Sequence, residues 1–380
     1  MDILYIALSP FDSVYSCSIR NQSLVSGLLQ LGHRVDFLTV ANETGIERQS
    51  VRSLGPNLRI VEINSTAGDK ASKAEASSPG YFGSVLRFFY HRLFLFEFIG
   101  KRVWRLKTNP IAGRNYDVVI SSSDPKASHA YAKHLMKKQI TYSRWIQYWG
   151  DPLAIDITNK TIYPMWYKKR VEGALLKAAD KVIYTSPFTL NRQKEIFSEC
   201  AEKMFSFPTP YREVKEFPRT KNSRFVVGYH GYYIEFIRNI EPLLAAFESL
   251  GSDFELDLVG MSDLDLKGTS NVNVHAVTGN IEAFERRSDL LVVLLNRRGT
   301  QIPGKVFHMA GTNKPILVIV DGEHKEELSK YFRDFKRYYV CDNNCEQIVV
   351  EINKVKDERL IYDADPQFSA VSVARQFIEF

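Results

Sequence analysis

The sequence predicts an α/β protein built from two tandem doubly wound domains. Its 380 residues are too many for one core of ordinary size and too few for three. Hydrophobic residues make up 44% of the chain and charged residues 25%, which excludes a disordered, collagenous or coiled-coil protein. Apolar runs alternate with helically spaced segments in two successive series, and this alternation is typical of parallel sheets whose strands are connected by helices.

The first series begins with an apolar run at 3–8 and a serine-rich loop, followed by leucines at helical spacing over 24–31 and a second apolar run at 35–40. Gly32 stands where the C-cap of that helix is expected. Strand, helix and strand together have the length of one crossover unit, which favours a parallel sheet. The same rhythm predicts strands at 117–122, 145–148 and 181–186 and a helix at 127–138.

The second series predicts strands at 224–229, 256–260, 290–295 and 315–320. Between the two series, two prolines and a charged stretch interrupt the periodicity, which indicates a domain boundary. We therefore divide the chain into an N-terminal domain (1–207), a linker (208–223), a C-terminal domain (224–366) and a last helix (367–380). Ligands of such sheets bind at the carboxyl ends of the strands, so we expect them in a cleft between the domains.

Several classes of protein are excluded by what the sequence lacks. Four cysteines are too few for a disulfide framework and have no zinc-finger spacing, which favours a reduced, cytoplasmic compartment. We expect no targeting segment, because the first residues carry an acid and lead directly into a strand, and no membrane span, because no apolar run reaches eighteen residues. The net charge of +6 is mild, and we expect no nucleic-acid partner. No Gly-X-Gly-X-X-Gly follows either opening strand, which argues against a dinucleotide oxidoreductase.

The most specific segment is 301–317, which reads QIPGKVFHMAGTNKPIL. A proline and glycine turn places Lys305 at the start of a short helix, and Lys314 with Pro315 begins a buried strand. Free backbone N–H groups and a lysine ammonium in the first helical turn attract an anion. The segment therefore predicts a phosphate site, and the alternative is an ordinary surface lysine.

This segment resembles the donor-site helix of the GT-B glycosyltransferases of family four. The pattern of that family is Pro, any residue, Lys, two apolar residues, an acid and Tyr, then four residues and Lys-Pro-Ile-Leu. Similar stretches follow the family order along most of the chain, at 31–35, 121–129, 178–186 and 227–231. The resemblance implies two Rossmann-like domains facing a cleft, which is the GT-B fold, and a last helix that crosses back to the N-terminal domain. It also implies retaining transfer of a sugar from a nucleotide sugar, without a metal or another cofactor.

The resemblance also implies which residues bind the donor. Lys305 matches the family lysine that contacts the diphosphate, and Arg238 matches best the second basic contact. Both would neutralise the charge that develops on the departing diphosphate, and we expect them to be catalytic. The remaining donor-binding residues implied are Gly231, Tyr232, Asn239, Val306 and His308.

Two departures from the family pattern concern the donor. Thr300 and His308 stand where the family has two glutamates eight positions apart, the second of which binds the ribose. A neutral imidazole can bond one ribose hydroxyl but cannot accept from both as a carboxylate does. Tyr232 stands where many members have arginine, so only one of the two expected bases comes from this loop.

A candidate for acceptor chemistry is Asp151, which ends a strand and stands between Gly150 and Pro152. A carboxylate there can orient or deprotonate an acceptor hydroxyl, and the alternative is that it caps a turn. Three further residues are expected on the acceptor side: Arg20, Asp124 and His129. For His129 a satisfied position on a helix face is the alternative. The pair Asp263 and Asp265 has the spacing of a metal motif, but the fold resembled needs no metal, and we predict no metal site.

The segment 86–107 is dense in aromatic and basic residues, which suits a helix lying at a membrane interface. The alternative is a core helix with charged ends. Under the first interpretation, an anionic membrane surface is a partner, and the protein is peripheral on the inner face of the cell membrane. The residues expected to contact lipid are Arg87, Arg92, Lys101 and Arg102.

The resemblance implies a hexosyltransferase that moves a sugar from a nucleotide sugar to a saccharide or lipid-linked acceptor in bacterial surface polysaccharide or glycoconjugate biosynthesis. One alternative is a nucleotide-sugar 2-epimerase of the same fold, which would need clustered acids and histidines that the sequence does not indicate. Another is a catalytically silent binding protein of the GT-B fold.

Overall fold

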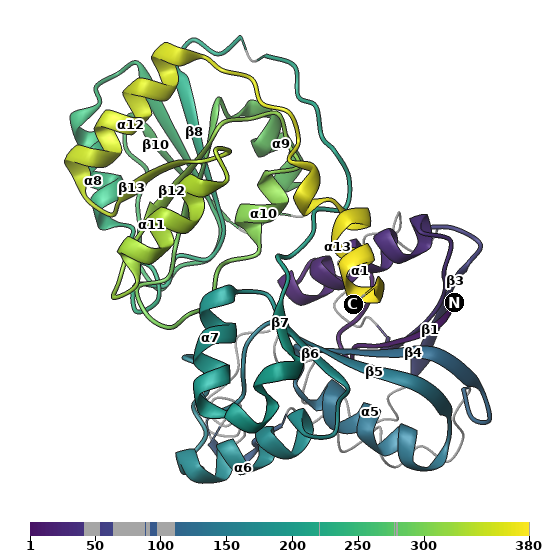
Figure 1. Cartoon of the computed structure of the whole chain (residues 1–380). Helices are drawn as coiled ribbons and strands as arrows, with labels where there is room; N and C mark the ends of the chain where they lie inside the picture. Colours follow the sequence, from purple (N-terminus) through teal and green to yellow (C-terminus); the bar gives the residue numbers. More distant parts are fainter. Residues whose placement is uncertain are drawn as a thin grey trace. The chain divides into compact units, whose positions relative to one another are not determined.

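The computed structural model describes residues 1–41, 54–63, 88, 92–96, 111–219, 221–276, 278 and 280–379. The chain divides into two compact units (Figure 1). The N-terminal unit consists of Met1–Arg212 together with Ala370–Phe380, and the C-terminal unit consists of Glu213–Ser369.

The N-terminal unit is built on a seven-stranded parallel sheet with the order β3-β2-β1-β4-β5-β6-β7. Its strands are β1 (Asp2–Ile6), β2 (Arg34–Val40), β3 (Leu58–Ile63), β4 (Asn115–Ser122), β5 (Thr141–Trp149), β6 (Lys181–Tyr184) and β7 (Met204–Ser206). Its helices are α1 (Ser16–Gln30), α5 (Ala127–Lys138), α6 (Met165–Leu176), α7 (Pro187–Ile196), the 3-10 helix η2 (Ser198–Lys203) and α13 (Ala370–Glu379).

This sheet is buried on both faces. Along β1, Leu4 and Ile6 pack into one apolar cluster with side chains of α5, whereas Ile3 and Tyr5 pack into a second cluster with side chains of α1 and α13. A strand covered on both faces needs apolar side chains at every position, which explains why the sequence shows a continuous apolar run here and not an alternating one.

Helix α13 belongs to the N-terminal unit although it follows the C-terminal unit in the chain. It lies beside α1, yellow against purple in Figure 1. A Cβ at Gly27 of α1 would lie 2.0 Å from the carbonyl oxygen of Ala370, so only glycine allows the two backbones to approach this closely. Phe377 packs its ring edge-on against Tyr148 at 4.8 Å, and Arg144 donates a hydrogen bond of 2.9 Å to the Ile378 carbonyl.

The C-terminal unit is built on a six-stranded parallel sheet with the order β10-β9-β8-β11-β12-β13. Its strands are β8 (Phe225–His230), β9 (Phe254–Val259), β10 (Val272–His275), β11 (Leu290–Leu294), β12 (Ile316–Val320) and β13 (Tyr339–Asp342). Its helices are α8 (Glu241–Ser249), α9 (Ile281–Arg287), α10 (Lys305–Met309), α11 (Lys325–Asp334), α12 (Cys345–Glu358) and the 3-10 helix η3 (Pro366–Phe368).

The prediction of two doubly wound α/β domains is confirmed by these two sheets. In each sheet the strand order reverses once beside the opening strand, between β1 and β4 in the first and between β8 and β11 in the second. Ligands of open parallel sheets bind at the carboxyl ends of the strands at such a switch point. We therefore expect the functional residues of each unit at these two places.

Candidate functional site

At the switch point of the C-terminal unit, Lys305 lies against the end of β8. The lysine is the first residue of α10, as the sequence predicts, and its Nζ donates a hydrogen bond to the carbonyl oxygen of His230. A Cβ at Gly231 would lie 2.9 Å from this Nζ, so the absence of a side chain at Gly231 leaves room for the ammonium. The lysine is thereby held at the carboxyl end of the central strand.

Arg238 is the second cation at this switch point. Its Nη1 donates to the Tyr232 carbonyl at 2.8 Å, and its Nε donates to Oδ1 of Asn296, directly beyond β11, at 3.0 Å. Desolvation and the nearby Arg238 guanidinium lower the pKa of Lys305 to about 8. Two cations held this close repel each other, and an anion placed beside them would remove that repulsion and raise the pKa of Lys305 again.

The other predicted donor residues lie on the same loops and on α10. Gly231 is buried and Tyr232 is exposed at the end of β8. Asn239 accepts a hydrogen bond from the backbone N–H of Glu241 at 3.1 Å, at the start of α8. Val306 is buried in α10, and His308 is half-buried one turn after Lys305.

Two residues of this site were missed by the sequence interpretation, His230 and Asn296. The imidazole of His230 is buried, neither ring nitrogen has a hydrogen-bond partner among the described residues, and desolvation and the Lys305 ammonium lower its pKa to about 4. It is therefore neutral at physiological pH. Asn296 could have been predicted from the sequence, because it is the first polar residue after the apolar run of β11.

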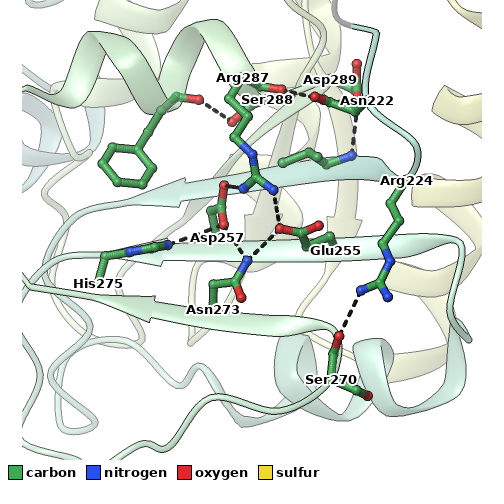
Figure 2. Close-up of polar contacts among 12 residues, drawn as sticks. Asn222, Arg224, Glu255, Asp257, Ser270, Asn273, His275, Arg287, Ser288 and Asp289 are labelled. Atoms are coloured by element: carbon green, nitrogen blue, oxygen red, sulfur yellow. Dashed lines mark hydrogen bonds and ion pairs between the residues drawn. The ribbon is translucent and has the colours of Figure 1, made fainter.

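A charged network lies on the sheet of the same unit (Figure 2). Arg287, at the end of α9, reaches across to the carboxylates of Asp257 and Glu255 on β9. Asn273 of β10 donates to Asp257 at 3.0 Å and to Glu255 at 2.6 Å, and His275 lies 3.4 Å from Asp257. Asp257 is 0% exposed, so these side chains take the place of water around its carboxylate.

Replacement of Arg287 by alanine is expected to lower the free energy of unfolding of the C-terminal unit by about 2–3 kcal/mol, because the buried Asp257 carboxylate loses its cation. Chemical unfolding followed by circular dichroism measures the change. The matched control is Arg286→Ala, since Arg286 makes an exposed pair with Glu282 and lies 5.3 Å from the centre of the Phe217 ring, and its loss should cost about 1 kcal/mol or less. Equal effects of the two substitutions would contradict the role assigned to Arg287.

At the switch point of the N-terminal unit, Arg20 of α1 is buried beside the ends of β4 and β5. Its Nη2 donates to Ser122 Oγ at 3.3 Å, and its guanidinium lies 4.8 Å above the Tyr148 ring. The neighbouring Asn21 accepts hydrogen bonds from Tyr5 at 2.9 Å and from Ser122 at 2.7 Å. Arg20, which we expect on the acceptor side from the sequence, is thus a buried cation at the carboxyl edge of the sheet.

Three carboxylates line a cavity of about 260 Å³ in this unit: Asp124, Asp151 and Asp156. Lys126 lies between two of them, with its Nζ 3.0 Å from Asp124 and 2.8 Å from Asp156. Asp151 receives no hydrogen bond on its carboxylate within the part of the chain that the structure describes. The rest of the lining consists of Phe94, Leu95, Phe96, Leu153, Thr158, Asn159, Lys160 and Thr161.

Asp151 has the protonation behaviour of a group that can accept a proton near neutral pH. Desolvation and the neighbouring carboxylates of Asp124 and Asp156 raise the pKa of Asp151 to about 7, although Lys126 and Arg20 act in the opposite direction. Such a carboxyl can hold a substrate hydroxyl when ionised and take up its proton. Glu172, which the sequence interpretation missed, is fully buried on α6, and burial raises its pKa to about 7.

His129 is fully buried in α5. Its Nδ1 lies 2.8 Å from Ser121 Oγ, and its ring stacks on Trp149 with ring centres 4.1 Å apart. Burial, together with the charges of Arg20 and Lys126, lowers the pKa of His129 well below its ordinary value, so the ring stays neutral. Among the described residues, the lining of the cavity that contains Asp151 does not include His129.

Most of the segment predicted to contact lipid lies outside the described residues, including Arg87, Lys101 and Arg102. Arg92 is described and exposed, and its guanidinium lies 4.4 Å above the Phe88 ring. No helix within the described ranges is long and apolar enough to cross a membrane. Nor do those ranges contain a group of histidine, cysteine, aspartate or glutamate side chains suited to a metal ion. Asp263 instead accepts a hydrogen bond from the Glu235 backbone N–H at 3.0 Å.

No family model and no curated protein sequence matches the chain. Solved structures match it over its whole length. The catalytic domain of starch synthase IV from Arabidopsis thaliana, bound to ADP and acarbose, has a TM-score of 0.61 at 10% identity over 100% of this chain and 98% of that chain. A glycosyltransferase from Rickettsia africae ESF-5 has a TM-score of 0.57 at 14% identity over 100% and 97%. A putative UDP-N-acetylglucosamine 2-epimerase from Listeria monocytogenes has a TM-score of 0.54 at 12% identity over 100% and 97%. At these identities the similarity establishes the fold, which is GT-B.

Proposed function

We propose that the protein is a glycosyltransferase that moves a sugar from a nucleotide-sugar donor to a hydroxyl of a saccharide or lipid-linked acceptor. The observation that carries the proposal is the pairing of Lys305 and Arg238 at the carboxyl ends of β8 and β11, the part of a doubly wound sheet that binds nucleotides. The ADP in the starch synthase structure supports a nucleotide as the ligand of such a fold.

The two cations suit the chemistry of the donor. When the bond between the anomeric carbon and the diphosphate oxygen breaks, negative charge develops on the leaving nucleoside diphosphate. A Lys305 ammonium and an Arg238 guanidinium fixed beforehand by protein carbonyls and by Asn296 stabilise that charge without having to reorganise. With a pKa of about 8, Lys305 is mostly protonated at neutral pH, and a bound diphosphate keeps it so.

The acceptor is assigned to the cavity of the N-terminal unit. Ionised Asp151 accepts a hydrogen bond from the acceptor hydroxyl and takes its proton as the hydroxyl oxygen bonds to the anomeric carbon and the bond from that carbon to the diphosphate oxygen breaks. For retention, the hydroxyl attacks on the same face of the sugar that the diphosphate leaves. Asp124, Lys126 and Asp156 supply further polar contacts in the same cavity, and Phe94 and Phe96 supply aromatic surface for a sugar ring. This division gives the donor and the acceptor separate binding sites on the two units.

Finer features of the proposal rest on the family resemblance. They are retention of configuration at the anomeric carbon, a hexose as the transferred sugar, independence from metals and cofactors, and a place in bacterial surface polysaccharide or glycoconjugate biosynthesis in the cytoplasm. Proton NMR of the product tests retention, because the coupling constant of the anomeric proton reports the configuration at that carbon. A configuration opposite to that of the donor would contradict retention.

The second candidate is a nucleotide-sugar 2-epimerase, which the fold of the Listeria neighbour favours. That reaction moves a proton at the second carbon of the sugar and needs a free acid or base beside the diphosphate. His230 is such a group beside Lys305, because its neutral imidazole makes no hydrogen bond among the described residues, whereas the nearby Glu285 carboxylate is paired with Lys215 at 3.0 Å. Conversion of a nucleotide sugar to its epimer without an acceptor would select this candidate.

One nucleoside diphosphate of a panel is expected to stabilise the protein in a thermal-shift experiment. At a hundred times its Kd a ligand adds about 2.7 kcal/mol, which corresponds to about 5–10 °C in a unit of this size. Inorganic phosphate is the control, because it lacks the base and ribose and should give a much smaller shift. A protein that no nucleotide stabilises would contradict the donor site, and one that binds a nucleotide but turns over no sugar would be a silent binding protein.

A further inference from the structure

Large apolar side chains are exposed together at the start of α6. Ile162 is 61% exposed, Met165 48% and Trp166 66%, all within five residues of the chain. Leu93 and Phe88 are also exposed. The two segments are hydrogen-bonded side by side, since the Ile162 N–H donates to the Arg92 carbonyl and the Tyr163 hydroxyl to the Leu93 carbonyl, both at 3.0 Å. We call these five apolar residues the α6 patch.

Positive charge surrounds the α6 patch. Lys169 and Arg170 are exposed one turn further along the same helix, and Lys160 and Arg92 are exposed on the two segments that join it. The exposed positions of α6 include no acid, because its glutamate, Glu172, is fully buried. The patch and its border therefore combine apolar and basic side chains without acidic ones on the helix.

This combination fits a membrane surface of negative charge. An exposed apolar cluster with a charged border marks an interaction site, because covering it removes large side chains from water. Tryptophan is suited to the headgroup layer, where its ring is buried and its N–H remains hydrated. Basic side chains one turn away reach the phosphates of anionic lipids.

The α6 patch also adjoins the cavity that contains Asp151. Phe94, Leu95 and Phe96 of the cavity lining follow Leu93 in the chain, and Lys160 and Thr161 precede Ile162. The patch and the cavity lining therefore share two short stretches of the chain, so a hydroxyl group carried by a molecule anchored at the patch would lie close to the cavity.

We propose that the α6 patch binds an anionic bilayer surface and that the acceptor is consequently a lipid-linked saccharide. The statement about the acceptor rests on the proposed transferase activity. The patch and its border share Phe88, Arg92 and Leu93 with the segment 86–107 considered above, and the other apolar residues of the patch lie on α6 or directly before it. Met165 and Trp166 enter the headgroup layer, while Lys169 and Arg170 contact lipid phosphates.

Vesicle co-sedimentation of the full chain tests the membrane contact. The parent protein should bind vesicles rich in phosphatidylglycerol, bind pure phosphatidylcholine vesicles weakly and lose binding at high salt. Met165→Ser/Trp166→Ser should weaken binding about tenfold or more, because the apolar contribution is lost. Its matched control is Val350→Ser/Ile361→Ser, which removes apolar side chains of 62% and 58% exposure in the C-terminal unit and should leave binding unchanged.

A second pair of variants tests the charged border. Lys169→Gln/Arg170→Gln should weaken binding to anionic vesicles about tenfold or more and leave the weak phosphatidylcholine binding unchanged. Lys267→Gln/Lys330→Gln removes the same charge from exposed positions of the C-terminal unit and should have little effect. All substitutions are at exposed positions, so unchanged circular dichroism is expected.

The inference is overturned if the parent binds neither vesicle, if binding is independent of lipid charge, or if the serine pair binds as the parent does. Self-association that the serine pair abolishes would make the patch an interface between copies of this chain. Failure with vesicles while a nucleotide still stabilises the protein would leave the proposed transferase intact. Vesicle binding without any nucleotide effect would refute the transferase and keep the membrane contact.

Discussion

Lys305→Ala is expected to lower kcat/KM for sugar transfer by about a hundredfold to a thousandfold. The ammonium is fixed on the His230 carbonyl beside Arg238, and its charge acts on the leaving diphosphate as the donor bond breaks. Because the charge on the diphosphate increases in the transition state, kcat should fall more than KM rises. Steady-state kinetics with the nucleotide sugar identified by the thermal-shift panel measure both constants.

The control for this prediction is Lys330→Ala, which removes an exposed lysine of α11 and should change neither constant. Arg238→Ala should have an effect of similar size, and the double variant with Lys305→Ala should fall short of the product of the two, since both side chains act on one diphosphate. Activity within about threefold of the parent in Lys305→Ala, a change of less than 1 kcal/mol, would remove the central support for the transferase proposal.

Asp151→Asn is expected to lower kcat by about a hundredfold or more and to abolish a pH dependence near neutrality. The pKa of Asp151 is raised to about 7, so the carboxyl is largely protonated below that pH and ionised above it. Only the ionised form can accept the hydrogen bond and proton of the acceptor hydroxyl. The rate of the parent should therefore rise with pH through about 7 and then level, whereas the asparagine variant should show no such rise.

The groups around Asp151 require a discriminating control. Asp124, Asp156, Lys126 and Arg20 act on its pKa, Lys160 lines the same cavity, and buried Glu172 has a pKa of about 7 as well. Glu172→Gln should therefore shift the profile at most slightly, and Glu195→Gln, at an exposed position of α7, should leave it unchanged. If the rate still rises with pH in Asp151→Asn but no longer does so in Glu172→Gln, the titrating carboxyl is Glu172, and the role assigned to Asp151 is wrong.

The central strands of both sheets could be predicted from the sequence because burial on two faces requires unbroken apolar runs. The interpretation located β1, β2, β4, β5 and β6 in the first sheet and β8, β9, β11 and β12 in the second, and α5 with its observed bounds. It missed the outer strands β3, β7, β10 and β13. These are short or half-exposed and therefore show neither a continuous run nor a clear alternation.

The candidate sites were predictable where the chain order itself carries the signal. Lys305 follows a proline and glycine turn, and Asp151 follows a strand, so both could be named from local sequence. The pairing of Arg287 with Asp257 could not, because the two residues are 30 positions apart and meet only when α9 packs on the sheet. The exposure of Trp166 could not be predicted either, since an aromatic residue at the start of a helix is more often part of a core.

The place of α13 has a consequence for how the chain is made. Residues 370–379 complete the apolar cluster on one face of the first sheet, and they leave the ribosome only after all of residues 213–369. The C-terminal unit is one uninterrupted stretch and can close as soon as it emerges. The N-terminal unit is therefore synthesised first but completes its fold last. Until α13 has been synthesised, the face of α1 around Gly27 is not covered by that helix.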